Sequence, residues 1–142
     1  MRCRDIMKRE VWSVRPTEQV YRAAEKMAAE RIGFLPVLDA MKRVVGVITD
    51  RDLALRVVAR RLPPSTPVEE VMSRDLTWVK ALDPIRKAEE LMAATKRSRI
   101  AVVDDFGECV GIISLSDIAH AVPHDESGQL LESVTGREVA HA

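Results

Sequence analysis

The sequence predicts an α+β fold that is built from two copies of one β-α-β-β-α unit. The segment 46–53, Gly-Val-Ile-Thr-Asp-Arg-Asp-Leu, recurs 65 positions later (111 − 46) as Gly-Ile-Ile-Ser-Leu-Ser-Asp-Ile at 111–118. Between 5–54 and 70–119, 15 of 50 ungapped positions are identical, whereas unrelated segments match at about 6% from ordinary residue usage. Short apolar runs also alternate with helical patterns in the same order in both copies. The chain is therefore a tandem repeat, and each functional feature is sought twice.

Each copy opens with a short strand and continues into an amphipathic helix. The predicted first strands are 11–14 and 76–79, which combine β-branched and aromatic residues. We expect the first helix to stop near Gly33, a natural C′ residue, and the second among the cations of 96–98. Apolar residues at helical spacing predict both helices, and they are Val20, Ala23, Ala24, Met27 and Ala28 in the first copy and Ile85, Ala88, Leu91, Met92 and Thr95 in the second.

The second half of each copy predicts a hairpin that is followed by another helix. Continuous apolar runs indicate buried strands at 34–38 and 100–103, and the partner strands lie at 44–48 and 109–113. Pro36 cannot donate to a ladder, so it must lie at a strand start, an edge or a bulge. The next helices begin at Thr49 and Ser114, each at a Thr/Ser-x-x-Asp turn.

These patterns divide the chain into two repeats, a linker and a tail. Repeat 1 spans 1–62, and the proline-rich stretch 63–69 is the linker, because its prolines cannot continue a helix. Repeat 2 spans 70–122. The tail, 123–142, loses the periodicity, although 130–134 can add a further helical turn or two.

Composition and charge exclude several classes of function. With 22 basic and 22 acidic residues the chain is neutral, which disfavours nucleic acid and anionic membranes as partners. No apolar run spans a bilayer and the N-terminus lacks a signal peptide, so we expect a cytoplasmic protein. Cys3 and Cys109 are expected to be reduced and structural. A zinc site would require Cys109 to meet the histidines near the tail, and it is not favoured; they are His120, His124 and His141.

Two β-α-β-β-α repeats that each close on G-h-h-[ST]-x-x-D resemble a tandem pair of cystathionine-β-synthase (CBS) domains. The wording of the motif at 49–56 and 114–119 carries this resemblance, which covers about 115 of the 142 residues. The layout is similar to stand-alone CBS-pair proteins such as the small hypoxia-response proteins of mycobacteria. The resemblance implies a sandwich-like α/β arrangement with pseudo-twofold symmetry, in which two sheets pack face to face. It also implies clefts between the repeats for AMP, ADP, ATP, NAD or S-adenosylmethionine, and association of two modules as a homodimer.

The motif residues suit such a ligand chemically. An ionised carboxylate accepts two hydrogen bonds from vicinal ribose hydroxyls, and Asp52 and Asp117 stand at the first turn of a helix in each copy. Hydroxyls and a cation beside them could receive phosphate, and apolar strand residues could wall the adenine. The predicted ligand-binding set is Val11, Trp12, Phe34, Pro36, Thr49, Arg51, Asp52, Thr77, Trp78, Arg99, Ala101, Ser114, Ser116 and Asp117.

Two differences predict that the sites are inequivalent. Arg51 stands where the second copy has Ser116, and Arg99 stands where the first has Phe34. Trp12 and Trp78 are 66 positions apart, one more than the repeat shift of 65. Adjacent strand residues point to opposite faces, so at most one of the two tryptophans can line its ligand site.

An alternative interpretation assigns both motifs to helix capping alone, because [ST]-x-x-[DE] before a helix is also a capping box. The chain would then be a structural or interaction protein without a nucleotide ligand. No Walker loop, nucleophile elbow or metal-ligand cluster indicates an enzyme. We therefore predict no catalytic residue and no required cofactor; an adenine nucleotide would be a ligand, and an unidentified protein could be a partner.

Overall fold

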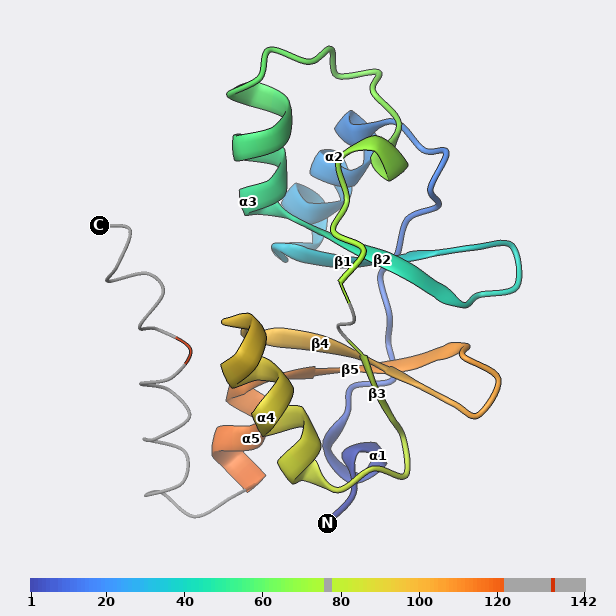
Figure 1. The fold of residues 1–142 in the computed structure, drawn as a ribbon, viewed down its shortest axis with the longest axis vertical. Coiled ribbons are helices and arrows are strands. Elements are labelled where there is room, and N and C mark those ends of the chain that lie inside the picture. The colour runs from blue at the N-terminus through green and yellow to red at the C-terminus, as the bar shows by residue number, and fades with distance from the viewer. Residues whose placement is uncertain (76–77, 122–133, 135–142) are drawn as a thin grey trace. The chain divides into compact units, whose positions relative to one another are not determined.

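The structure is a computed structural model that describes residues 1–75, 78–121 and 134 (Figure 1). It contains helices and strands in the order expected of an α+β protein, which confirms the predicted class. The elements are α1 (Cys3–Ile6), α2 (Val20–Glu30), β1 (Phe34–Leu38), β2 (Val44–Thr49), α3 (Asp50–Asp52), the π-helix η1 (Leu53–Val58), the 3₁₀ turn η2 (Val68–Glu70), β3 (Trp78–Lys80), α4 (Ile85–Thr95), β4 (Arg99–Val103), β5 (Cys109–Ser114) and α5 (Leu115–Ala121).

The chain forms two compact units, and each unit draws on both sequence repeats. Unit 1 consists of Met1–Val11, Thr77–Asp105 and Val110–Ala142, and unit 2 of Trp12–Leu76 and Phe106–Cys109. In unit 2, α2 and α3 lie on one face of the β1–β2 hairpin, and in unit 1, α4 and α5 lie on one face of the sheet β3-β4-β5 (Figure 1). The short segment at the start of each repeat belongs to the unit that holds the hairpin of the other repeat.

We call these two segments, residues 1–11 and 70–75, the exchanged segments. Matching backbone bridges hold both of them. In unit 1, Lys8 and Ile112 of β5 exchange two hydrogen bonds of 2.9 Å. In unit 2, Ser73 and Val47 of β2 do the same, also at 2.9 Å. The 65-residue shift relates Lys8 to Ser73 and Val47 to Ile112. A second pair of bridges, Arg2–Pro84 and Gln19–Pro67, obeys the same relation.

The glycine of each motif makes room for the exchanged segment. A Cβ on Gly46 would lie 2.8 Å from both Met72 Sδ and the Ser73 carbonyl oxygen. A Cβ on Gly111 would lie 2.6 Å from Met7 Sδ and 3.0 Å from the Lys8 carbonyl oxygen. Neither glycine has a positive φ, so the motif uses glycine here for close approach of another backbone and not for an unusual conformation.

The predicted strand at 11–14 is wrong, because within this segment only Val14 makes a bridge, an isolated parallel one with Val37. Its counterpart in unit 1 is a true strand, in which Trp78 and Val79 of β3 pair with Ala101 and Val102 of β4. Pro36 occupies the position of Ala101 and has no N–H to donate, so the ladder between the first strand and β1 cannot extend beyond the Val14 bridge. Residues 76–77 of the other predicted strand lie outside the described residues.

The first helix ends near Gly33 as expected, but the prediction that Gly33 is its C′ residue is wrong. Helix α2 ends at Glu30, and Arg31 takes the left-handed conformation with φ 55°. Lys96 ends α4 in the same way with φ 56°. Gly33 serves a different purpose, because a Cβ there would overlap the carboxylate of Asp50.

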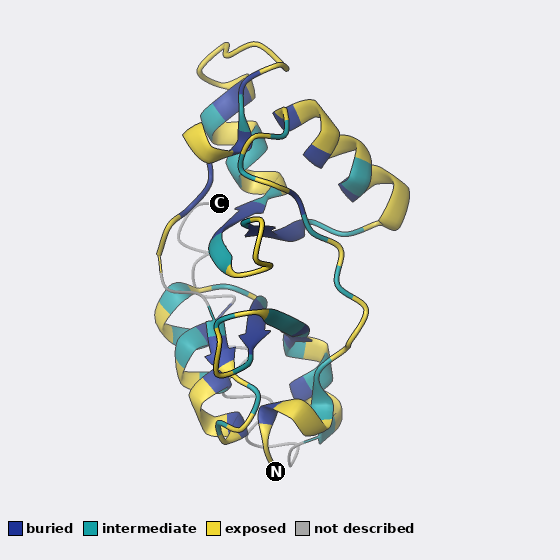
Figure 2. Ribbon diagram, turned by 90° about the vertical axis from the view of Figure 1, so that its right-hand side faces the viewer, coloured by how far each residue is buried: buried dark blue, intermediate teal, exposed yellow. Residues whose placement is uncertain are grey.

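Each unit has its own aliphatic core, which lies along the strands and the inward faces of the helices (Figure 2). In unit 1, Met92, Ile100, Ile113 and Ile118 are fully buried, and Val134 joins this cluster. The core of unit 2 includes fully buried Leu35, Val37, Ile48 and Val68, together with Val14.

Candidate functional site

The two motif turns form capping boxes of nearly identical geometry. Asp52 Oδ2 accepts a hydrogen bond from the Thr49 backbone N–H at 2.9 Å, and Thr49 Oγ1 accepts one from the Asp52 N–H at 3.1 Å. Asp117 and Ser114 repeat these bonds at 2.9 and 3.1 Å. The capping prediction is therefore confirmed in both repeats. The cap occupies only one oxygen of each carboxylate, so Oδ1 remains available as an acceptor.

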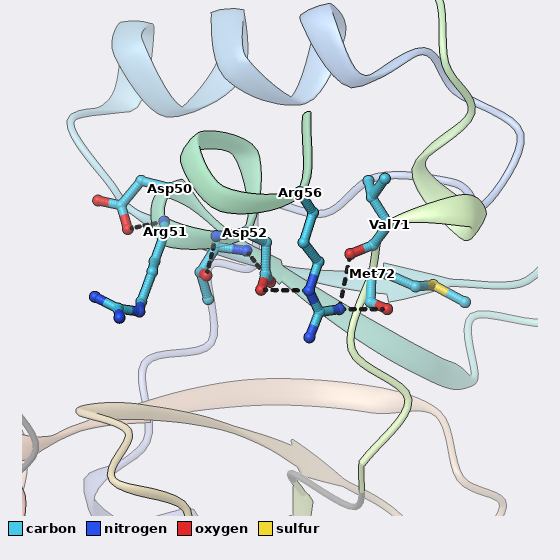
Figure 3. A network of polar contacts seen from close by, with 7 residues as sticks. Asp50, Arg51, Asp52, Arg56, Val71 and Met72 are labelled. Atoms are coloured by element: carbon cyan, nitrogen blue, oxygen red, sulfur yellow. Dashed lines mark hydrogen bonds and ion pairs between the residues drawn. The ribbon is translucent and has the colours of Figure 1, made fainter. Parts of the chain in front are cut away.

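In unit 2 the remaining oxygen of Asp52 lies near Arg56, whose guanidinium is hydrogen-bonded to the backbone. Arg56 Nε lies 3.8 Å from Asp52 Oδ1, and Arg56 Nη1 donates to the carbonyl oxygens of Val71 and Met72 at 3.0 and 3.2 Å (Figure 3). The Asp52 side chain is 13% exposed. Arg56 thus links the motif acid to the exchanged segment that packs on Gly46.

In unit 1 the cation comes from the exchanged segment itself. Lys8 Nζ lies 3.8 Å from Asp117 Oδ1, and the side chains are 75% and 13% exposed, respectively. The sequence interpretation missed both cations. Arg56 could have been found, because it lies four residues after Asp52 on a helix. Lys8 gave no signal, since its approach to Asp117 depends on the exchange of segments.

The other polar residues of the predicted set lie at the edges of these turns. The Arg51 backbone N–H donates to Asp50 Oδ1 at 2.8 Å, and its exposed side chain points away from the pair of Asp52 and Arg56 (Figure 3). Ser116 is exposed, and its carbonyl oxygen lies 2.7 Å from His120 Nδ1. These positions add a cation beside the first turn and none beside the second.

The residues proposed to wall the adenine differ in exposure. Phe34, Pro36 and Ala101 are buried within the units that contain them. Trp12 is 39% exposed and Trp78 is half-buried in β3. Val11 and Arg99 are half-buried, and Thr77 lies outside the described residues. Of this group, Trp12, Phe34 and Pro36 belong to unit 2 with Asp52, and Val11, Trp78, Arg99 and Ala101 belong to unit 1 with Asp117.

The thiols and histidines offer little further chemistry in the part of the chain that the structure describes. No group of three His, Cys, Asp or Glu residues there could hold a metal ion, and His124 and His141 lie outside it. Burial, and secondarily the charge of Asp83, raises the pKa of the Cys3 thiol to about 11. Among the described helices none is long and apolar enough to cross a bilayer.

Comparison with known proteins identifies the family. The CBS domain family matches residues 3–59 and 68–124. The CBS domain-containing protein YhcV of Bacillus subtilis (strain 168) is 31% identical over 137 residues, which cover 96% of both chains. Hypoxic response protein 1 of Mycobacterium tuberculosis is 30% identical over 132 residues, 92% of both chains.

Solved structures agree with this assignment. A crystal structure of Hypoxic Response Protein I with two coordinated zinc ions has a TM-score of 0.80 and 31% identity, and covers 87% of this chain and 100% of its own. CBS domain protein PAE2072 from Pyrobaculum aerophilum, complexed with AMP, has a TM-score of 0.78 and 28% identity, and covers 92% and 98%. The motif, the repeat, the fold and these similarities lead to one conclusion: the chain belongs to the CBS domain family and carries two CBS domains in tandem.

Proposed function

We propose that this CBS pair is a cytoplasmic regulatory module that binds an adenosine-containing ligand through Asp52 and Asp117. One observation carries the proposal: in both repeats the capping box uses Oδ2 of the acid and leaves Oδ1 without a hydrogen bond from the described residues. A carboxylate oxygen without a hydrogen bond can accept ribose hydroxyls in charge-assisted bonds. The similarity to a CBS protein complexed with AMP supports this choice of ligand class.

A thermal-shift panel of AMP, ADP, ATP, NAD, S-adenosylmethionine and GTP tests the proposal. A ligand at about 100 times its dissociation constant stabilises the native state by about 2.7 kcal/mol, which corresponds to a rise on the order of 5–10 °C for a chain of this length. The doubly substituted protein Asp52→Asn/Asp117→Asn is the control, because asparagine keeps an oxygen for the cap but loses the charge. Melting temperatures that do not move at millimolar concentrations of any of these compounds would rule out the adenosine function.

The alternative, a structural or interaction protein with no nucleotide ligand, also has support, because both caps are complete without any ligand. Exposed apolar side chains on and after η1 add to it: Leu55 is 50% exposed, Val58 is 74% exposed and Leu62 is 36% exposed. A contiguous apolar patch marks a protein interface, and these three residues lie close together in sequence. We infer from them that the protein forms a homodimer, which is compatible with either function.

A further inference from the structure

We propose that Lys8 is the specificity-determining cation at Asp117, where it selects adenosine ligands that carry phosphate over uncharged ones. This inference rests on the function proposed above and names the ligand class for one of its two acids. It concerns a residue of the exchanged N-terminal segment, 109 positions before Asp117 (117 − 8).

The backbone of Lys8 is fixed, whereas its side chain is free to reach a ligand. Two hydrogen bonds of 2.9 Å join Lys8 to Ile112 in β5 and hold its Cα next to the motif strand. The side chain is 75% exposed, and its contact with Asp117 Oδ1 is 3.8 Å long. That distance exceeds a hydrogen bond, so the three N–H donors of the ammonium are not committed to the carboxylate.

The pair of Lys8 and Asp117 suits a ligand that presents hydroxyls and an anion together. The carboxylate alone accepts hydroxyls but repels phosphate. Lys8 cancels that charge at close range and supplies charge-assisted donors of its own. An uncharged adenosine would gain only the hydroxyl contacts, and a cationic adenosine compound would be repelled by the ammonium. The pair should therefore favour a nucleoside phosphate.

The cation at Asp52 is held differently. Arg56 Nη1 is committed to two carbonyl oxygens of the exchanged segment, and the side chain is only 40% exposed. Under the 65-residue shift, the position equivalent to Lys8 is Ser73 and the position equivalent to Arg56 is Ala121. Neither repeat therefore has a cation at the position where the other repeat has one. Arg56 is therefore a structural clamp, and it does not offer uncommitted donors at Asp52 as Lys8 does at Asp117.

Calorimetric titration with AMP and with adenosine tests this role. The Asp52→Asn protein isolates the Asp117 site while keeping the first cap. In that background we compare Lys8 with Lys8→Gln, Lys8→Arg and a matched control, Lys87→Gln, which removes another exposed pair with Lys87 Nζ 3.6 Å from Asp83 Oδ1. Lys8→Gln should weaken AMP binding about tenfold and change adenosine binding less than about twofold. Lys8→Arg should restore AMP binding, and Lys87→Gln should change neither ligand.

Salt provides a second readout that a purely structural lysine would not move. Raising the ionic strength should weaken AMP binding more in the protein with Lys8 than in Lys8→Gln. Melting temperatures without ligand should agree among the variants, because an exposed ion pair contributes little to stability.

The possible failures are distinguishable. Equal losses of AMP and adenosine, or an unchanged AMP affinity in Lys8→Gln, would overturn the role of Lys8 and leave the adenosine function intact. Loss of all binding in Asp52→Asn, while the unsubstituted protein still binds, would show that Asp117 holds no ligand and would also overturn it. If neither AMP nor adenosine binds the unsubstituted protein, the role of Lys8 is overturned, and the thermal-shift panel decides separately whether the adenosine function holds.

Discussion

Cys3 links the stability of unit 1 to alkaline pH. Its thiol is fully buried, and burial is the main reason that its pKa rises from 9.0 to about 11. Between these values the folded protein keeps the proton while the unfolded chain releases it. Fewer protons are then bound in the unfolded state, so the free energy of unfolding falls as pH rises from about 9 to about 11. The contribution of this group is fully present below pH 9.

Urea denaturation of the native protein and of Cys3→Ala across this pH range tests the prediction. The alanine protein should be less stable at pH 8, because a buried sulfur is lost. The difference between the two proteins should then shrink toward pH 11, since only the native protein has the thiol to titrate. Parallel curves would mean that Cys3 does not titrate within the folded protein as expected.

A second residue-scale prediction concerns one turn position in the two hairpins. Lys42 has φ 64° and its repeat counterpart Gly107 has φ 81°. The left-handed conformation costs an L-residue about 1–2 kcal/mol, but it costs glycine little beyond chain entropy. Lys42→Gly should therefore stabilise the protein by about 0.5–1 kcal/mol, and Gly107→Ala should destabilise it by about 1 kcal/mol. Urea midpoints measure both, and shifts of the same sign would refute the conformational explanation.

Some residue-scale features of the site were predictable from the sequence, and others were not. The capping bonds of Asp52 and Asp117 follow from the spacing of the motif, because they join residues three apart. Arg56 is also local in sequence. Lys8 contacts Asp117 only because a distant segment pairs with β5, and local patterns contain no information on such a contact.

At the scale of elements, the exchanged segments depend on Gly46 and Gly111. Alanine at either position should destabilise the protein by about 1–3 kcal/mol, as overpacking usually does. Gly46→Ala should be the worse of the two, because its Cβ would meet the Ser73 carbonyl oxygen at 2.8 Å, and that backbone is held by Val47. At Gly111 the nearest atom is Met7 Sδ at 2.6 Å, on a flexible side chain.

A double-mutant cycle separates these two situations. Met7→Ala should recover part of the stability lost in Gly111→Ala, because it removes the nearest atom. Met72→Ala should recover less in Gly46→Ala, because the backbone oxygen remains. Coupling energies from urea unfolding give the comparison, and an equal recovery in both repeats would contradict the assigned contacts.

Most elements were predictable from periodicity, and the failures have local causes. The hairpins and the amphipathic helices lie where the apolar patterns place them. The prediction of a strand at 11–14 was wrong because its partner strand, β1, has Pro36 where β4 has Ala101. The end of α2 failed because Arg31 adopts the left-handed conformation that the sequence pattern assigns to glycine. In the first case the deciding residue, Pro36, lies in another element. In the second, the deciding residue is Arg31, two positions before the glycine that the pattern favoured.

At the scale of the whole molecule, the proposed homodimer is tested by light scattering after size exclusion. A chain mass of 15.9 kDa distinguishes a monomer from a dimer clearly. We expect a dimer at micromolar concentration, and Leu55→Glu/Val58→Glu should shift the mass toward one chain, since charge on an apolar interface opposes association. Leu82→Glu is the matched control, because Leu82 is 48% exposed and belongs to unit 1, whereas Leu55 and Val58 belong to unit 2. A single-chain mass for the unsubstituted protein would refute the dimer.

The repeat and the family were visible in the sequence, but the composition of the compact units was not. A repeat boundary records where similarity begins again, whereas a compact unit is defined by contacts. Met1–Val11 resembles residues near 70 in sequence, yet among the described residues it packs with 78–105 and 110–121. No local pattern distinguishes this exchange from two repeats that fold separately.

The exchange has a consequence for the order in which the protein is made. All residues of the unit 2 core lie between Val14 and Met72, so this core is complete once the first half of the chain has emerged from the ribosome. Met1–Val11 emerges earlier still, but Ile112 and Pro84, to which it pairs, are synthesised much later. Met1–Val11 therefore cannot make these pairings until the later residues have been synthesised. N-terminal regions generally fold first during synthesis, but Ile6 and Met7 can join the core of unit 1 only after β5 has been made.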